Sequence, residues 1–279
     1  MEILLKHITS YDYKYPVSGI VQSTKLYPSP HNGLEILSWS VQHSSAKKSK
    51  IYKDAEVNNI QSFTSSKPLK SIQFTVTGKV KTLDTNGIYI NAEETIDPLV
   101  YLRDSVLTIP SADIKNLALE AKNGFTESEN LETSHNLMKL VTKKVEYKPL
   151  TTTNDTTAQD AYKQKRGVCQ DQAHIMISAA RTIGIPARYV NGYMHNNSHP
   201  SDFQATHAWA EFYIQNLGWI GFDPTNNCCP DERYIRVSCG LDASYASPIR
   251  GIFYGHSNQD NVIENLNINV ETQENSSQQ

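Results

Sequence analysis

The hydrophobic periodicity of the chain changes near residue 110, and this change constrains the fold more than any other feature of the sequence. Before it, apolar residues alternate with polar ones at 2–9, 35–43 and 71–80, a period of two that is typical of strands with one buried face. Beyond it, apolar residues recur three and four positions apart, as in amphipathic helices. The sequence therefore predicts an antiparallel β-domain followed by a segment that opens with helices.

The second half of the chain is predicted to place several helices before a group of strands. Helices are expected at 112–122, 127–145, 158–165 and 172–183, and strands at 187–194, 207–214 and 218–222. Gly184 and Pro186 end the last helix, because a glycine followed by a proline is a common helix stop. Helices and antiparallel strands in separate runs indicate the α+β fold class.

The composition is that of an ordinary folded protein. The 279 residues are 38% hydrophobic and 20% charged, and 26 basic against 29 acidic side chains give a net charge of −3. This balance provides no basic patch for nucleic acid or for an anionic membrane. The apolar run at 3–5 is far too short for a signal peptide, and no segment reaches the length of a membrane span. We therefore expect a cytoplasmic protein with no nucleic-acid or membrane partner.

The four cysteines, Cys169, Cys228, Cys229 and Cys239, fit neither a zinc motif nor a dense disulfide framework. In the reducing cytoplasm all four are expected to be thiols. A zinc site built from Cys228, Cys229 and a histidine is the alternative, but adjacent cysteines are poor tetrahedral ligands. We expect neither a metal nor another cofactor.

Cys169 is the cysteine whose position favours chemistry. It stands at the N-terminus of the helix that continues through 172–183, where unpaired backbone N–H groups favour a reactive thiolate. Gly167 lets the chain turn sharply into that helix, and the same N–H groups could hold the oxyanion of a tetrahedral intermediate. The alternative is a buried, inert cysteine, which is the more common state of cysteine on an apolar helix.

His207 and Asp223 supply the other two groups of a candidate catalytic triad. His207 opens the strand predicted at 207–214, and Asp223 directly follows the strand at 218–222. A hairpin of these strands places both side chains near one end, where the carboxylate orients the imidazole that deprotonates a thiol. Each residue alone has a structural alternative, a surface histidine or an aspartate in a proline turn. Their joint order after Cys169 favours catalysis.

Four successive motifs resemble those of the transglutaminase-like superfamily. They are Arg166-Gly167-Val168-Cys169-Gln170-Asp171, the segment 184–193 (GIPARYVNGY), His207-Ala208-Trp209-Ala210-Glu211 and the segment 219–226 (WIGFDPTN). The β-rich segment before them and the segments 234–242 and 250–255 are similar to a bacterial branch of this superfamily. The resemblance therefore covers nearly the whole chain.

The resemblance implies a papain-like, α+β transglutaminase core, in which the helix bearing Cys169 packs on an antiparallel sheet. Cys169 would be the nucleophile, His207 the general base and then acid, and Asp223 the orienting partner. The substrate would be a peptide, protein or other amide that passes through a thioester. Gln164 is implied as an oxyanion donor, by analogy with papain-like enzymes, beside the N–H of Cys169.

This interpretation divides the chain into a β-sandwich-like domain at 1–105, a transglutaminase-like core with C-terminal strands at 106–270, and a polar, disordered tail at 271–279. Thiol-dependent hydrolysis of amide or peptide bonds is the leading function. Transamidation is the alternative enzyme activity, and a non-catalytic protein-binding module is the alternative from another class. The motifs specify neither the substrate nor the oligomeric state.

Overall fold

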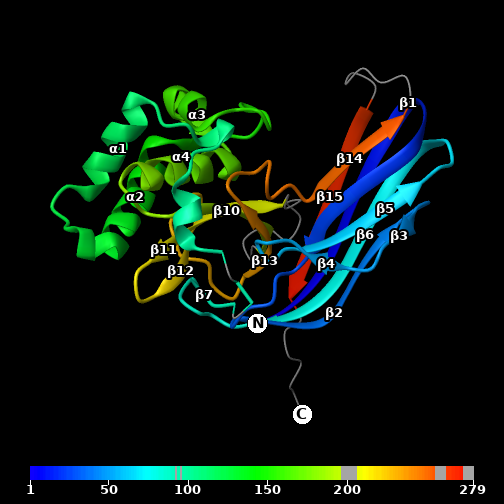
Figure 1. Cartoon of the computed structure of the whole chain (residues 1–279), viewed down its shortest axis with the longest axis horizontal. Coiled ribbons are helices and arrows are strands. Elements are labelled where there is room, and N and C mark those ends of the chain that lie inside the picture. Colours follow the sequence, from blue (N-terminus) through cyan, green and yellow to red (C-terminus); the bar gives the residue numbers. More distant parts are fainter. Residues whose placement is uncertain (92, 95, 196–205, 255–261, 273–279) are drawn as a thin grey trace, which may run out of the picture.

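The computed structural model describes residues 1–91, 93–94, 96–195, 206–254 and 262–272. Figure 1 shows a large, curved β-sheet beside a smaller sheet that is packed against helices. The larger sheet contains β1 (Glu2–Tyr27), β2 (Leu34–His43), β3 (Lys47–Lys48), β4 (Tyr52–Lys53), β5 (Asn59–Ser65), β6 (Leu69–Thr82), β14 (Ile249–Tyr254) and β15 (Val262–Thr272). The smaller sheet contains β7 (Ile88–Tyr89), β10 (Ala187–Met194), β11 (His207–Ile214), β12 (Gly218–Phe222) and β13 (Tyr234–Gly240). The predicted α+β fold class is confirmed.

The long strand β1 organises the larger sheet. Its first half pairs with β6 and β15, and its second half pairs with β5 and β14. A shift in register between Asp12 and Val17 separates the two halves. The apolar side chains of the halves meet, because Phe63 of β5 contacts Phe74 of β6 with ring centroids 5.3 Å apart. The domain is therefore a sandwich whose layers share one strand.

The smaller sheet, with strand order β13-β10-β11-β12-β7, carries the helices of the core. These are α1 (Ala112–Lys122), α2 (Asn130–Lys144), α3 (Ala158–Gln164) and α4 (Cys169–Thr182), with 3-10 turns at Pro98–Leu102, Val106–Thr108 and Glu127–Glu129 and the paired strands β8 (Glu146–Tyr147) and β9 (Arg166–Gly167). Ser111 caps α1, since its Oγ accepts from the N–H of Ile114 at 3.3 Å. No helix within the described residues is long and apolar enough to span a membrane.

Helix α4 is the centre of the core. Its Ala173, Ile177 and Ala180 are fully buried in one cluster with Ala208 and Phe212 of β11. The expected arrangement, a cysteine-bearing helix packed on an antiparallel sheet, is therefore present. Such packing fixes the start of α4 relative to the ends of the neighbouring strands.

The observed strand pairing differs from the predicted domain limits. β14 and β15 fall largely within the predicted core segment at 106–270, but they pair with β1 of the larger sheet. β7 falls within 1–105 but pairs with β12. Residues 271 and 272 complete β15 instead of opening the tail predicted at 271–279, while 273–279 lies outside the described residues. Period-two patterns indicate that a strand exists, but not which distant strand it pairs with.

Candidate active site

Cys169 is the first residue of α4, and the residues around it fix the start of the helix. Val168 is extended, with φ −107° and ψ −176°, and its N–H donates to Asp171 Oδ2 at 2.7 Å. Thr152 Oγ1 donates to the same oxygen at 2.7 Å. The N–H groups of Cys169 and Gln170 have no acceptor within the helix, as in any first helical turn. The partly exposed Cys169 thus lies where the helix dipole favours an anion.

Gly167 is needed for this tight helix start. A Cβ at Gly167 would lie 2.6 Å from Asp171 Oδ2 and 2.7 Å from Asp171 Cβ, which is far inside contact distance. We expect Gly167→Ala to displace the first turn of α4 and to slow alkylation of Cys169 by iodoacetamide about tenfold or more, because reactivity depends on exact placement of the thiol. Mass spectrometry measures the rate, and circular dichroism shows whether the variant is folded. An unchanged rate in a folded variant would contradict this role of Gly167.

His207 and Asp223 lie at the same end of the β11–β12 hairpin. The two strands are antiparallel with Ala210 opposite Phe222, so the first residue of β11 stands near the residue that follows β12. His207 Nε2 and Asp223 Oδ2 are 2.6 Å apart. Asp223 is fully buried, and only 9% of the His207 surface is exposed. The ring of Trp209 lies beside that of His207, with centroids 6.1 Å apart.

The electrostatics of the site favour an imidazolium beside Cys169. Burial alone would lower the pKa of His207, but the charge of Asp223 and hydrogen bonds to Asp223 and Cys169 raise that pKa to about 10. Burial would likewise raise the pKa of Asp223, but His207 holds it below its usual range. Because Nε2 contacts Asp223, Nδ1 is the ring nitrogen left for Cys169. The structure therefore brings the three predicted residues together.

Two further side chains, which were not predicted from the sequence, hold Asp223. Tyr234 OH and Asn226 Nδ2 each donate to Asp223 Oδ2 at 2.7 Å, while the N–H of Thr225 donates to Oδ1 at 2.9 Å. The position of Asn226 could have been predicted locally. In such turns an aspartate side chain commonly accepts hydrogen bonds from backbone N–H groups two and three residues later, which brings Asn226 close to Asp223. Tyr234 begins β13, and no local pattern connects it with Asp223.

Two tyrosines interact electrostatically with Cys169. Burial raises the pKa of Tyr147 and of Tyr189, and the charge of Cys169 raises the pKa of both further. Gln164 is the last residue of α3 and is exposed, and its role as an oxyanion donor stays a prediction. All four cysteines are free. In the described parts of the chain, no group of three or more His, Cys, Asp or Glu side chains could hold a metal ion.

Two family models match the chain. The model of the transglutaminase-like superfamily matches residues 118–224, and the model of the bacterial transglutaminase-like N-terminal region matches residues 3–81. An uncharacterized protein of Mycobacterium leprae is 28% identical over 263 residues, which cover 91% of this chain and 94% of that protein. The protein-glutamine gamma-glutamyltransferase of Pseudomonas aeruginosa is 32% identical over 106 residues, which cover 36% of this chain and 15% of that enzyme.

A solved structure shares the whole fold. The crystal structure of a protein described as a "Putative Cysteine Protease" from Cytophaga hutchinsonii superposes with a TM-score of 0.75 and 19% identity, covering 100% of this chain and 92% of that one. At this identity the likeness concerns the fold. The match extends over both the β-domain and the core, in agreement with the two family models. The chain therefore contains a transglutaminase-like core, with a bacterial transglutaminase-like N-terminal region before it.

Proposed function

We propose that the protein is a thiol-dependent hydrolase of amide or peptide bonds. The observation that carries this proposal is the buried 2.6 Å contact between His207 and Asp223, beside a cysteine at the N-terminus of a helix. A nucleophile, a base in contact with it and a third group that orients the base are the parts that acyl transfer requires. The transglutaminase-like core supports the same reaction class.

In the first proposed step, the sulfur of Cys169 attacks the carbonyl carbon of the amide while His207 holds the thiol proton on Nδ1. The backbone N–H of Cys169 donates to the oxyanion that forms, and Gln164 is proposed as the second donor. When the intermediate collapses, the C–N bond breaks and His207 gives its proton to the departing amine. A thioester on Cys169 remains.

In the second proposed step, a water molecule attacks the thioester and His207 accepts its proton. The carboxylic acid leaves, the sulfur of Cys169 is released as the thiolate, and His207 retains the proton. An amine in place of water would form a new amide by the same route. The likeness of 106 residues to the Pseudomonas aeruginosa protein-glutamine gamma-glutamyltransferase makes transamidation the second candidate.

Trapping of the acyl-enzyme tests the proposal. The protein is mixed with a panel of peptide anilides and glutamine-containing peptides, quenched in acid and digested for mass spectrometry. We expect an acyl group on Cys169 that is absent from Cys169→Ala and retained by Cys229→Ala. A free acid as the product identifies hydrolysis, and incorporation of an added labelled amine identifies transamidation.

Two results together would overturn the enzyme proposal. One is the absence of any acyl group on Cys169 over the whole panel. The other is an alkylation rate of Cys169 that does not change in His207→Ala, since a working nucleophile depends on its base. A non-catalytic binding protein would then be the better interpretation of the same fold.

A further inference from the structure

A groove of about 1000 Å³ lies between the larger sheet and the core. On the side of the larger sheet, His7, Thr9 and Tyr11 line it, and these residues share one face of β1 because they are two positions apart. On the core side, Tyr189 of β10 and the loop at 242–248 line it, and the first two residues of β14 continue the lining. In Figure 1 this region lies between β1, β14 and β15 on one side and the helices on the other.

Two residues of the groove lining directly adjoin members of the candidate triad in the sequence. Gln170 lines the groove and directly follows Cys169, and Thr206 lines it and directly precedes His207. Tyr189 also lines it and belongs to the buried cluster against which Cys169 packs. Cys169 and His207 are not themselves among the lining residues, so a bound chain would reach the sulfur past Gln170 and Thr206.

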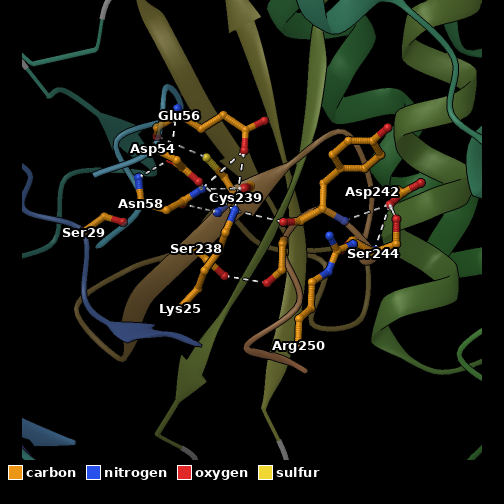
Figure 2. Close-up of polar contacts among 12 residues, drawn as sticks. Lys25, Ser29, Asp54, Glu56, Asn58, Ser238, Cys239, Asp242, Ser244 and Arg250 are labelled. Carbon is orange, nitrogen blue, oxygen red and sulfur yellow. Dashed lines mark hydrogen bonds and ion pairs between the residues drawn. The ribbon is translucent and has the colours of Figure 1, made fainter. Parts of the chain in front are cut away.

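The loop at 242–248 is held in place from both domains, as Figure 2 shows. Lys25 of β1 donates through Nζ to the carbonyl oxygen of Tyr245 at 3.0 Å. From the core, Ser238 Oγ donates to the carbonyl oxygen of Ala246 at 2.7 Å. These contacts hold the loop in place before a ligand binds, so less conformational entropy is lost on binding.

The side chains of the groove suit an uncharged chain of amide groups. Neutral hydroxyl and amide side chains provide most of its polar lining: Thr9, Asn154, Gln170, Asn191, Thr206, Ser244 and Ser247. Exposed charges of both signs, Asp155 and Arg250, also line it, so it does not present one sign of charge to a polyion. Its volume is at the upper end of the roughly 300–1000 Å³ of small-ligand sites, and an extended chain needs only about 3.3 Å of length per residue.

We infer that this groove binds the extended polypeptide that flanks the reacting amide, so that β1 of the N-terminal domain forms part of the substrate site. The inference rests on the proposed function, because it places the substrate beside Cys169. It gives the β-domain a part in selecting the substrate, in addition to any structural role.

Covalent probes of increasing length test the inference on the full chain. Peptidyl chloromethyl ketones extend from the acyl side, and iodoacetyl peptides extend from the amine side. In each, the sulfur of Cys169 forms a bond to the CH₂ carbon and the halide leaves with the electron pair. Iodoacetamide is the probe without a peptide. We expect probes with four residues to alkylate Cys169 about tenfold faster than one-residue probes in at least one series, because remote binding energy speeds reaction at the attached group.

Variants at three tyrosines show where this increase in rate arises. Tyr11→Ala on β1 and Tyr245→Ala on the loop should each remove most of the increase in alkylation rate that the longer probes produce. Tyr15→Ala is the matched control, since Tyr15 lies on β1, is 53% exposed and is outside the groove lining. Tyr245 is 46% exposed and belongs to no core cluster, so its variant should fold even if Tyr11→Ala does not.

The outcomes distinguish a failure of the groove inference from a failure of the proposed function. The iodoacetamide rate should be equal in the parent and in Tyr15→Ala, and its dependence on His207 tests the proposed function alone. No gain with length in either probe series would overturn the groove inference, and so would a gain that survives in Tyr245→Ala.

Discussion

Replacement of Asp223 by asparagine is expected to lower amide turnover about 1000-fold or more, because it removes the buried charge that stabilises the imidazolium form of His207. Asp223 Oδ2 accepts from His207 Nε2, from Asn226 and from Tyr234, while Oδ1 accepts from the N–H of Thr225. Asparagine can satisfy the three donors on Oδ2 with its amide oxygen, but it brings no negative charge to the site. The buried His207 then lacks the charge that stabilises its imidazolium form, so it is a much weaker base toward Cys169.

The same variant should change the pH dependence of Cys169 alkylation. With Asp223 charged, the pKa of His207 is raised to about 10, so the imidazolium beside the sulfur persists through neutral pH and is lost as the pH rises through about 10. Without that charge, burial of the ring lowers the pKa, and the imidazolium is lost below neutral pH. Alkylation at pH 6 to 7 should therefore fall strongly and recover only near pH 8.5, where an unassisted thiol ionises.

Asp231→Asn is the control for this experiment. Asp231 pairs with Arg233 at 2.6 Å at a partly exposed site, so its loss should leave both turnover and the pH profile nearly unchanged. If Asp223→Asn kept more than a tenth of the parent turnover with an unchanged profile, Asp223 would have no orienting role.

Glu211→Gln is expected to cost about 3–5 kcal/mol in the free energy of unfolding, because it leaves two buried guanidinium groups without their shared carboxylate. Glu211 Oε2 accepts from Arg188 Nε at 2.7 Å, and Oε1 accepts from Arg236 Nε at 2.7 Å. All three side chains are almost completely buried. Arg188 also stacks on Trp219, 3.8 Å from the ring centroid. Urea unfolding at pH 7, followed by tryptophan fluorescence, measures the difference.

The pH dependence of that difference provides a second check. Burial would raise the pKa of Glu211, but Arg236 and Arg188 outweigh it and lower the pKa to about 2. The stabilisation is therefore complete above the ordinary glutamate pKa of 4.5 and is lost as the pH falls toward about 2. Glu120→Gln, which removes the partner of Lys144 at an exposed site, should cost less than about 1 kcal/mol. Equal losses in the two variants would contradict the buried-network interpretation.

Local patterns were sufficient to predict the helices of the core and the position of the candidate triad. The helix through Cys169 and the hairpin carrying His207 and Asp223 depend on residues close together in the chain. Tyr234 and the Arg188 network could not be predicted in this way, because their contacts join strands whose register depends on the whole sheet. A charged residue in a strand pattern gives no sign of whether it is buried with a partner.

The pairing of β1 has a consequence for the order in which the chain folds. Ile3 lies opposite Thr272, so the strand that the ribosome makes early pairs with one that emerges hundreds of residues later. The helices and the hairpin of the core have nearer partners and can form while synthesis continues. Pairing over such separations is slow, and until β15 arrives one edge of β1 is open to strands of other chains. Fast synthesis, or a chaperone that shields this edge, should therefore increase the yield of soluble protein.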